Sequence, residues 1–314
     1  MAVSNGWPDL SRLDLRPTTE ALHLWSQVVG KVRLSLTPWI NHSWHVALYV
    51  SARGLTTGLI PIGLRAFEIE FDLIGDTLTI RDTNGQERRV ALVPQSVATF
   101  YASTVQALND LGIDVRLDPM PCELPEAVPF HSDIVVRQYD SETARSYWHA
   151  LVQTHRVFQI FRTRFVGKCS PIHIFWGSFD LAVTRFSGRN APPHPGGAPH
   201  MPDAVMRDAY NQEVSSVGFW PGSGIVEAPS YYSYAYPVPK GFAEGRVQPD
   251  AAGFSTEMGE FLMPYEAVRA STDPDATLLA FLQSTYEAAA NLADWDRQFL
   301  EGSTGPIGHP PAGA

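Results

Sequence analysis

A strict alternation of apolar and acidic side chains over Arg65–Ile74 is the feature that most constrains the fold. Phe, Ile, Phe and Leu take every second position, and Glu, Glu and Asp lie between them. A period of two is typical of a half-buried strand with one apolar face and one acidic, solvated face. Two further expected strands, Thr77–Asp82 and Arg88–Val93, flank Asn84-Gly85, a dipeptide that favours a tight hairpin turn. This part of the chain therefore predicts an antiparallel sheet.

Helices are expected on both sides of these strands. One runs from about Thr19 to Leu36 and is followed by Pro38, and the other runs from about Ser96 to Leu111 and ends at Gly112. A strand near Val46–Ala52 lies between the first helix and the alternating segment. The first half of the chain therefore reads α-β-β-β-β-α.

The second half resembles the first in the order of its segments. A long helix over about Ser141–Phe165 precedes strands near Glu213–Trp220 and Tyr231–Pro237. Three pairs of segments also match in letters: LAVTRFSG (181–188) with ALYVSARG (47–54), FLMPYEAV (261–268) with VALVPQSV (90–97), and FLQSTYEAAANL (281–292) with FYASTVQALNDL (100–111). Self-similarity in a common order indicates a repeated unit. The alternative is convergence, because amphipathic helices rich in Ala and Leu resemble one another.

We therefore expect an α+β fold of two similar α-β-β-β-β-α repeats, with antiparallel sheets and helices packed on one face. The second repeat carries long loop insertions, one over Arg189–Pro202 and one over Pro239–Gly259. The expected boundaries are an N-terminal extension (1–17), the first repeat (18–125), the second repeat (126–300) and a disordered tail (301–314).

Composition excludes several classes of protein. The formal net charge is −10, which disfavours a nucleic-acid partner because phosphate backbones require a basic surface. No apolar run reaches the roughly 18 residues that a membrane span needs. The two cysteines, Cys122 and Cys169, lie far apart and predict neither a disulfide scaffold nor a thiolate zinc site. We expect a soluble, cytoplasmic protein whose partner is a small-molecule ligand, and the sequence leaves its oligomeric state open.

The stretch from Cys169 to Gly197 concentrates residues that can perform chemistry. An aromatic-rich strand carries His173, Asp180 and Arg185, and a rigid APPHPGG loop then presents His194. These four are the predicted catalytic residues: the two imidazoles act as acid, base or metal ligand, Asp180 orients an imidazole, and Arg185 binds an anionic group.

Each of these roles has an alternative. Asp180 and Arg185 are five apart on a strand and so lie on opposite faces, where a structural salt bridge to a helix would equally explain a buried charge. His194 is equally explained as an incidental residue of a stiff surface loop.

A metal site is also predicted, from the NHSWH segment. His42 and His45 occupy a place in the first repeat that corresponds to that of His173. His42, His45, His173, His194 and Glu213 together form a candidate ligand set. Mixed imidazole and carboxylate ligands suit Zn, Mn or Fe(II). The alternative is that each His is a hydrogen-bonded residue of the core or its rim.

Aromatic residues predict the walls of a pocket between the two repeats. The predicted substrate-binding residues are Trp176, Arg189, Trp220, Tyr232 and Tyr234. A tyrosine stripe of this kind is also typical of core packing. Familiar catalytic signatures such as GxSxG, GxxxxGK[ST] and GxGxxG are missing from the sequence.

Several runs together carry a resemblance, among them GKCSPIHIFWGSFDLAVTRFSGR, APPHPGG, EVSSVGFWPG and FLQSTYEAAANLADWDR. From about Trp7 to Glu301 the chain resembles a family of bacterial proteins, about 300 residues long, known only as a domain of unknown function. The resemblance implies one full-length unit and brings no activity with it. A His commonly precedes the Glu of EVSS in that family, whereas Gln212 stands here, which counts against a metal ligand at that position.

The sequence thus predicts a small-molecule enzyme of unstated reaction, with a pocket between two repeats and metal dependence as an option. A non-catalytic binding protein and an interaction scaffold with a purely structural aromatic core are the two alternatives.

Overall fold

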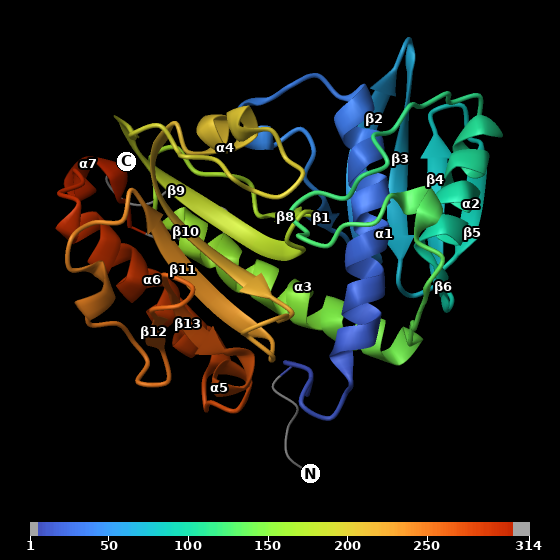
Figure 1. Ribbon diagram of the computed structural model, residues 1–314. Helices are drawn as coiled ribbons and strands as arrows, with labels where there is room; N and C mark the ends of the chain where they lie inside the picture. The colour runs from blue at the N-terminus through green and yellow to red at the C-terminus, as the bar shows by residue number, and fades with distance from the viewer. Residues whose placement is uncertain (1–5, 304–314) are drawn as a thin grey trace.

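Two antiparallel sheets lie on either side of a long helix, α1 (Leu15–Leu36), in the computed structural model, which describes residues 6–303 (Figure 1). Almost every residue of α1 from Ala21 to Arg33 is buried, polar ones included. A helix that is covered on all sides belongs to the interior, so α1 is a shared element of the core.

The first sheet is a five-stranded meander in which each strand pairs with the next one along the chain. Its strands are β1 (Tyr49–Val50), β2 (Gly54–Ile62), β3 (Arg65–Asp72), β4 (Thr77–Asp82) and β5 (Glu87–Ala91). α1 and α2 (Val97–Asn109) cover its apolar face: Trp25 stacks on Phe100, and Phe100 stacks on Phe71 of β3. Ser96 starts α2 by accepting a hydrogen bond from the Thr99 amide at 3.1 Å.

The second sheet has six strands in the order β12-β13-β11-β10-β9-β8. They are β8 (His173–Phe175), β9 (Asp180–Asn190), β10 (Gln212–Trp220), β11 (Ser230–Tyr236), β12 (Gly253–Ser255) and β13 (Glu260–Pro264). α3 (Ser141–Thr163) and α6 (Pro274–Leu292) pack on one face of this sheet, where Tyr147 stacks on Phe219 and Thr154 hydrogen-bonds Tyr231 at 3.0 Å (Figure 1).

Short elements complete the chain. They are η1 (Asn41–Ser43), β6 (Gln95–Ser96), η2 (Phe130–Ser132), β7 (Val136–Arg137), α4 (Asp203–Ala209), η3 (Phe242–Glu244), α5 (Tyr265–Arg269) and α7 (Arg297–Leu300). No helix in the described range 6–303 combines the length and apolar character needed to cross a membrane.

The α+β class and the antiparallel sheets are confirmed. The first sheet contains one strand more than expected, because Gly54–Ile62 forms β2. Its register shifts between Thr56 and Leu59, where Gly58 adopts a φ of +61°, and this irregularity, with Pro61, hides the alternation.

The expectation that the acidic face of β3 is solvated is wrong. Glu70 and Asp72 are buried, because Arg81 and Arg53 bind them at 3.0 and 2.7 Å. Each arginine neutralises a carboxylate that the fold has taken out of water.

The duplication stays a prediction. Each sheet contains a meander preceded and followed by a helix, as the repeat requires. The matched segments are not equivalent in one case, however: residues 181–188 lie within β9, whereas residues 47–54 end where β2 begins.

The two ends of the described chain are tied to the fold. Trp7 packs against Tyr265, whose hydroxyl donates to the Pro8 carbonyl at 2.9 Å. Near the other end Glu301 pairs with Arg297 at 2.5 Å. Most of the expected disordered tail, residues 304–314, lies outside the described residues.

Trp176 joins the two halves. Its indole N–H donates to the Val46 carbonyl at 2.9 Å, and its ring lies across Gly30 of α1. One residue pair, Leu48 and Ile174, also links the two sheets by reciprocal backbone hydrogen bonds of 2.9 and 2.8 Å.

We expect Gly30→Ala to destabilise the protein. A Cβ at this position would stand 2.2 Å from the Trp176 ring. Overpacking of this kind costs about 1–3 kcal/mol, more than the roughly 1 kcal/mol that Ala contributes as a better helix former. Urea denaturation measures the difference.

Gly253→Ala is the matched control. Gly253 begins β12 and nothing lies within 4 Å of its Cβ position, so its stability should change by less than about 0.5 kcal/mol. Equal stability of both variants would show that Trp176 does not require a bare Gly30.

Candidate functional site

The face of the second sheet that α3 and α6 leave uncovered carries polar and aromatic side chains. Register fixes this set: His173 lies opposite Ala182, Ala182 opposite Gly218, and Gly218 opposite Tyr232. Side chains alternate along a strand, so Asp180 shares this face with Ala182, and Tyr234 shares it with Tyr232. Four residues predicted from sequence therefore lie on one face: His173, Asp180, Tyr232 and Tyr234.

Asp180 is the centre of this face. It begins β9 directly after Phe179, whose φ of +60° marks a sharp turn. Ser178 donates a hydrogen bond to Asp180 Oδ1 at 2.5 Å, and the Tyr232 hydroxyl donates to Oδ2. Both carboxylate oxygens are thus held in place.

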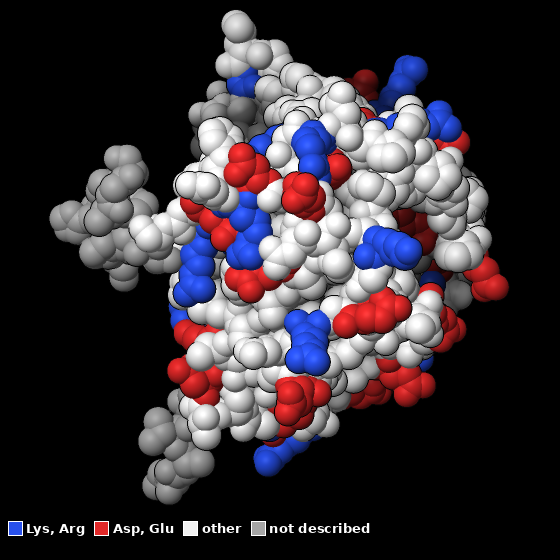
Figure 2. All heavy atoms as spheres, turned by 90° about the vertical axis from the view of Figure 1, so that its left-hand side faces the viewer, with Lys and Arg blue, Asp and Glu red and all other residues white. Residues whose placement is uncertain are grey.

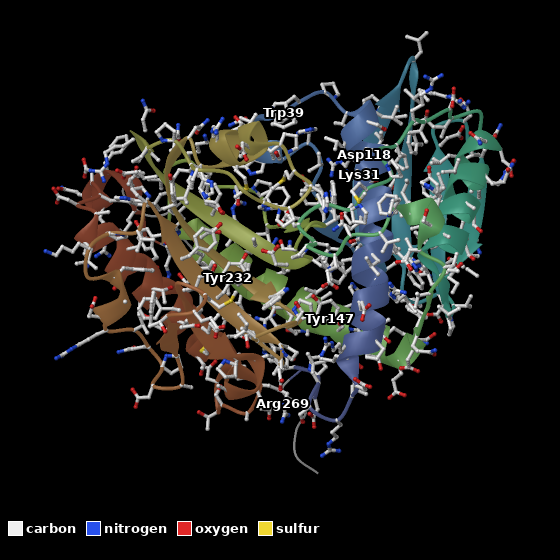
Figure 3. The ribbon with its side chains drawn as sticks, viewed as in Figure 1. Lys31, Trp39, Asp118, Tyr147, Tyr232 and Arg269 are labelled. Atoms are coloured by element: carbon white, nitrogen blue, oxygen red, sulfur yellow. The ribbon has the colours of Figure 1, made fainter. Side chains whose placement is uncertain are left out.

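Tyr232 reaches Asp180 because Gly218 lies between them. A Cβ on Gly218 would stand 2.2 Å from the Tyr232 ring, so the ring lies flat across the bare strand. Figure 3 shows Tyr232 over the strands of the second sheet. A strand glycine that admits a close approach is typical of such crossings.

Glu123 comes from the long connection between α2 and α3. α1 holds this connection: Lys31 pairs with Asp118 at 2.8 Å, and the Gln27 amide exchanges hydrogen bonds of 2.8 and 3.0 Å with the Cys122 backbone (Figure 3). A Cβ on Gly177 would stand 1.9 Å from Glu123 Oε1, so the carboxyl rests on a bare glycine beside Ser178.

Glu123 and Glu260 are acids with raised pKa values. Burial, reinforced by the negative charge of Asp180, raises the pKa of each carboxyl to about 7. Both side chains nonetheless keep part of their surface accessible. We call Asp180, Glu123 and Glu260 the Asp180 cluster.

His173 adds a hydrogen-bond acceptor beside the cluster. Its Nδ1 lies 2.8 Å from the Pro171 carbonyl, which can only accept, so Nδ1 carries the proton. Nε2 is then a buried lone pair, and it has no partner among the described residues. Burial lowers the pKa of His173, and the charge of Asp180 opposes that shift only in part.

His194 lies in the loop between β9 and α4 and contacts a tyrosine of the same sheet. Its ring stacks on Tyr210 at 4.7 Å and contacts Tyr236 at 5.1 Å, while Nδ1 accepts from the Gly196 amide at 3.0 Å. Tyr210 in turn hydrogen-bonds Tyr234 at 2.9 Å. His194 therefore connects with the tyrosines of the face, whereas His173 is not among its ring or hydrogen-bond partners within residues 6–303.

Arg185 faces away from the cluster. Its side chain is fully buried on the helix-covered face, where the guanidinium donates to the Phe161 carbonyl and lies over the rings of Phe161 and Tyr286 at 3.5 and 4.3 Å. Burial lowers its pKa to about 10. The expected salt bridge to a helix is replaced by a carbonyl and aromatic faces, and a substrate clamp has no support in this geometry.

The other predicted substrate-binding residues have mainly structural partners. Arg189 pairs with Glu213 at 2.6 Å and caps the end of α6 by donating to the Ala293 and Asp294 carbonyls at 2.6 and 3.1 Å. The Trp176 ring packs against Gly30 of α1, which is a structural contact. Trp220 ends β10 opposite Ser230 and is half-buried.

The five predicted metal ligands do not meet. No three His, Cys, Asp or Glu side chains form a metal-binding group anywhere in residues 6–303. His42 uses Nδ1 for the Ala209 carbonyl at 3.1 Å and Nε2 for Lys168 at 2.5 Å, and His45 uses Nδ1 for the Ile40 backbone at 3.3 Å. Glu213 is taken by Arg189, so its carboxylate is already neutralised.

Two hollows on the surface lie away from the Asp180 cluster. One, of about 220 Å³, lies between β10, β11 and the end of α6, beside Glu213 and Tyr236. The other, of about 370 Å³, lies along α6 and η3. Neither includes a residue of the Asp180 cluster.

Comparison with known proteins yields one match. The model of a family of unknown function, DUF5996, matches residues 7–302. The chain belongs to that family. Searches of curated proteins and of solved structures find nothing that matches the chain. The family has no stated activity.

Glu123, Glu260 and Tyr210 were missed by the sequence analysis. Glu260 had a signal, because Glu260 and Leu262 alternate with Phe261 and Met263 on a strand beside β11. Glu123 had none: it lies in an irregular connection, and only tertiary contacts of α1 bring it to Asp180.

We expect Glu123→Gln to stabilise the protein at about pH 8. The folded pKa lies near 7, above the unfolded value near 4.5, so the native state binds more protons and loses stability as pH rises through that interval. The neutral amide removes a penalty of about 1–3 kcal/mol at pH 8, and the two proteins should converge near pH 5. Urea denaturation at both pH values measures it.

Glu257→Gln is the control, because Glu257 is exposed between β12 and β13 and loses little hydration on folding. Its effect should be the same at both pH values. A Glu123→Gln protein whose stability relative to wild type does not change with pH would refute the raised pKa.

Proposed function

We propose that the protein is an enzyme that acts on a small polar molecule by general acid–base catalysis at the Asp180 cluster. The observation that carries the proposal is the carboxylate of Asp180, which Ser178 and Tyr232 hold in place on the open face of the sheet. Burial and the negative charge of Asp180 raise the pKa of Glu123 and of Glu260 to about 7. Carboxyls tuned to the working pH are a recurrent property of catalytic sites.

The three carboxyls have different capacities. Near neutral pH Glu123 and Glu260 are each divided between acid and carboxylate, so each can donate or accept a proton. Asp180 is oriented by Ser178 and Tyr232 and supplies fixed negative charge.

The chemistry of the site favours a substrate that is rich in hydrogen-bond donors. No Lys or Arg within residues 6–303 forms an ion pair with Asp180, Glu123 or Glu260, so the negative charge is uncompensated. Hydroxyl groups or a protonated amine fit such acceptors, and the tyrosine rings provide a surface for a flat part of the molecule. Because the described residues gather no metal-ligand group, the proposal includes no metal step.

We also infer that the protein is cytoplasmic and that it has no nucleic-acid partner. Both cysteines, Cys122 and Cys169, are free, which suits a reducing compartment. On the face shown in Figure 2, acidic and basic side chains are interspersed and no basic patch is formed.

We expect the wild-type chain to deplete at least one compound from a mixture of cellular small molecules, and Asp180→Asn to lose at least about 100-fold of that rate. Asn keeps the shape of the side chain but removes the charge that acts on both glutamates. Mass spectrometry of the mixture before and after incubation gives the readout.

Glu257→Gln again serves as the control and should convert the same compound at the wild-type rate. A compound that the wild type binds without converting it, and that Asp180→Asn no longer binds, would favour a non-catalytic binding protein instead. Identical profiles for wild type and Asp180→Asn would contradict any role for the cluster.

A further inference from the structure

The NHSWH loop (residues 41–45) contributes to a second set of reactive side chains, which lies away from the Asp180 cluster. His42 and Ser43 both adopt left-handed backbone conformations, with φ values of +58° and +57°. Non-glycine residues rarely do so, and such strain persists only where the surroundings impose it. Asp208 of α4 imposes it here by accepting a hydrogen bond from the His42 amide at 2.8 Å.

The same helix sets the tautomer of His42. Nδ1 lies 3.1 Å from the Ala209 carbonyl, so Nδ1 carries the proton and Nε2 is an acceptor. Lys168 Nζ lies 2.5 Å from Nε2. The imidazole is thus fixed as a base directed at the amine of Lys168, the arrangement that activates nucleophiles.

Lys168 has no carboxylate to hold it in the charged form. None of the ion pairs found within residues 6–303 involves it; its other contacts are Gln212 Oε1 at 3.3 Å and the rings of Phe186 and Trp44 at 4.7 and 5.8 Å. The two rings and the charge of Asp208 favour the ammonium form. Burial outweighs Asp208 and lowers the pKa of Lys168.

We propose that Lys168 is a nucleophilic amine that forms an imine with a small aldehyde or ketone, with His42 as its proton acceptor. The Lys168 side chain is half-buried, so part of it stays accessible to a small carbonyl compound. Desolvated lysines paired with a base are the form in which this residue performs Schiff-base chemistry.

The step balances without a cofactor. The Nζ lone pair forms a C–N bond to the carbonyl carbon, the C=O π pair moves to oxygen, and His42 Nε2 takes a proton from nitrogen. Imidazolium returns that proton to the alkoxide oxygen, which gives the carbinolamine. The second N–H proton follows the same route through His42 Nε2 to the hydroxyl, the C–O bond breaks and water leaves as C=N forms. One carbonyl compound and one amine give one imine and one water.

This site is independent of the proposed function. Lys168 lies beside Phe186, whose amide donates to its carbonyl at 3.0 Å, whereas Asp180 begins the same strand six residues earlier. Six residues of strand span about 20 Å. Loss of activity by Asp180→Asn therefore says nothing about Lys168.

The chain supplies its own internal controls, because it contains three lysines, Lys31, Lys168 and Lys240. Lys31 is buried against Asp118, and Lys240 is exposed. The full-length protein is incubated at about pH 7 with glycolaldehyde and cyanoborohydride, whose hydride reduces each imine to a stable secondary amine. Peptide mass spectrometry follows the three sites. We expect Lys168 to react at least about ten-fold faster than Lys240, and Lys31 to react slowest.

His42→Asn tests the base. Asn tolerates the left-handed backbone but cannot take the proton, so the rate at Lys168 should fall to that of Lys240 or below. His200→Asn is the matched control, since His200 also has a positive φ, +54°, but is exposed and lies outside the contacts of Lys168.

The pH dependence separates reactivity from simple access. The advantage of Lys168 over Lys240 should shrink towards about pH 10, where ordinary lysine amines are also neutral. The proposal is overturned if wild-type Lys168 reacts no faster than Lys240 at neutral pH. It is equally overturned if His42→Asn leaves the advantage intact, or if the advantage persists unchanged at high pH.

Discussion

The contact of Trp176 with Gly30 sets the position of Asp180, the residue around which the site is arranged. It fastens the turn between β8 and β9 to α1, and the next residue, Gly177, is fastened as well: its carbonyl lies 2.8 Å from His23 Nε2 on the same helix. Asp180 follows three residues later. Since α1 also holds the connection that carries Glu123, one buried helix fixes two of the three carboxyls relative to each other.

Two glycines then decide how closely the functional groups approach. Glu123 rests on Gly177 and Tyr232 lies across Gly218, and in each case a Cβ would overlap the visiting group. A side chain at either of these positions would hold Glu123 or Tyr232 further away. The site therefore depends on these glycines as much as on its polar residues, because the space left by the absent Cβ atoms allows Glu123 and Tyr232 to approach Asp180.

This dependence explains what the sequence could predict. Local patterns were sufficient for β3, β4 and α2, whose periods and, for α2, the capping residue Ser96 are visible in the letters. Alternation along β9 and β11 was sufficient to place Asp180 on a different face from Arg185 and to group Tyr232 with Tyr234. Glu123 could not be placed, because its position follows from α1 rather than from its neighbours in the chain. The prediction of a metal site was wrong for the same reason. The sequence shows that four His and one Glu could be ligands, but it does not show that each has a different protein partner in the fold.

Opposite demands on charge also explain why the two sites are separate. The Asp180 cluster gathers uncompensated negative charge, which would favour the ammonium form of any lysine brought near it. Lys168 requires the reverse, a neutral acceptor and apolar rings. β9 satisfies both by length: it presents Asp180 where α1 and its connection meet the sheet, and Phe186 where η1 and α4 meet it. Asp180 lies about 20 Å along β9 from Phe186, the neighbour of Lys168, which is further than the roughly 8 Å over which salt leaves exposed charges coupled. The length of a single strand therefore allows one chain to keep an acid site and a basic amine without either neutralising the other.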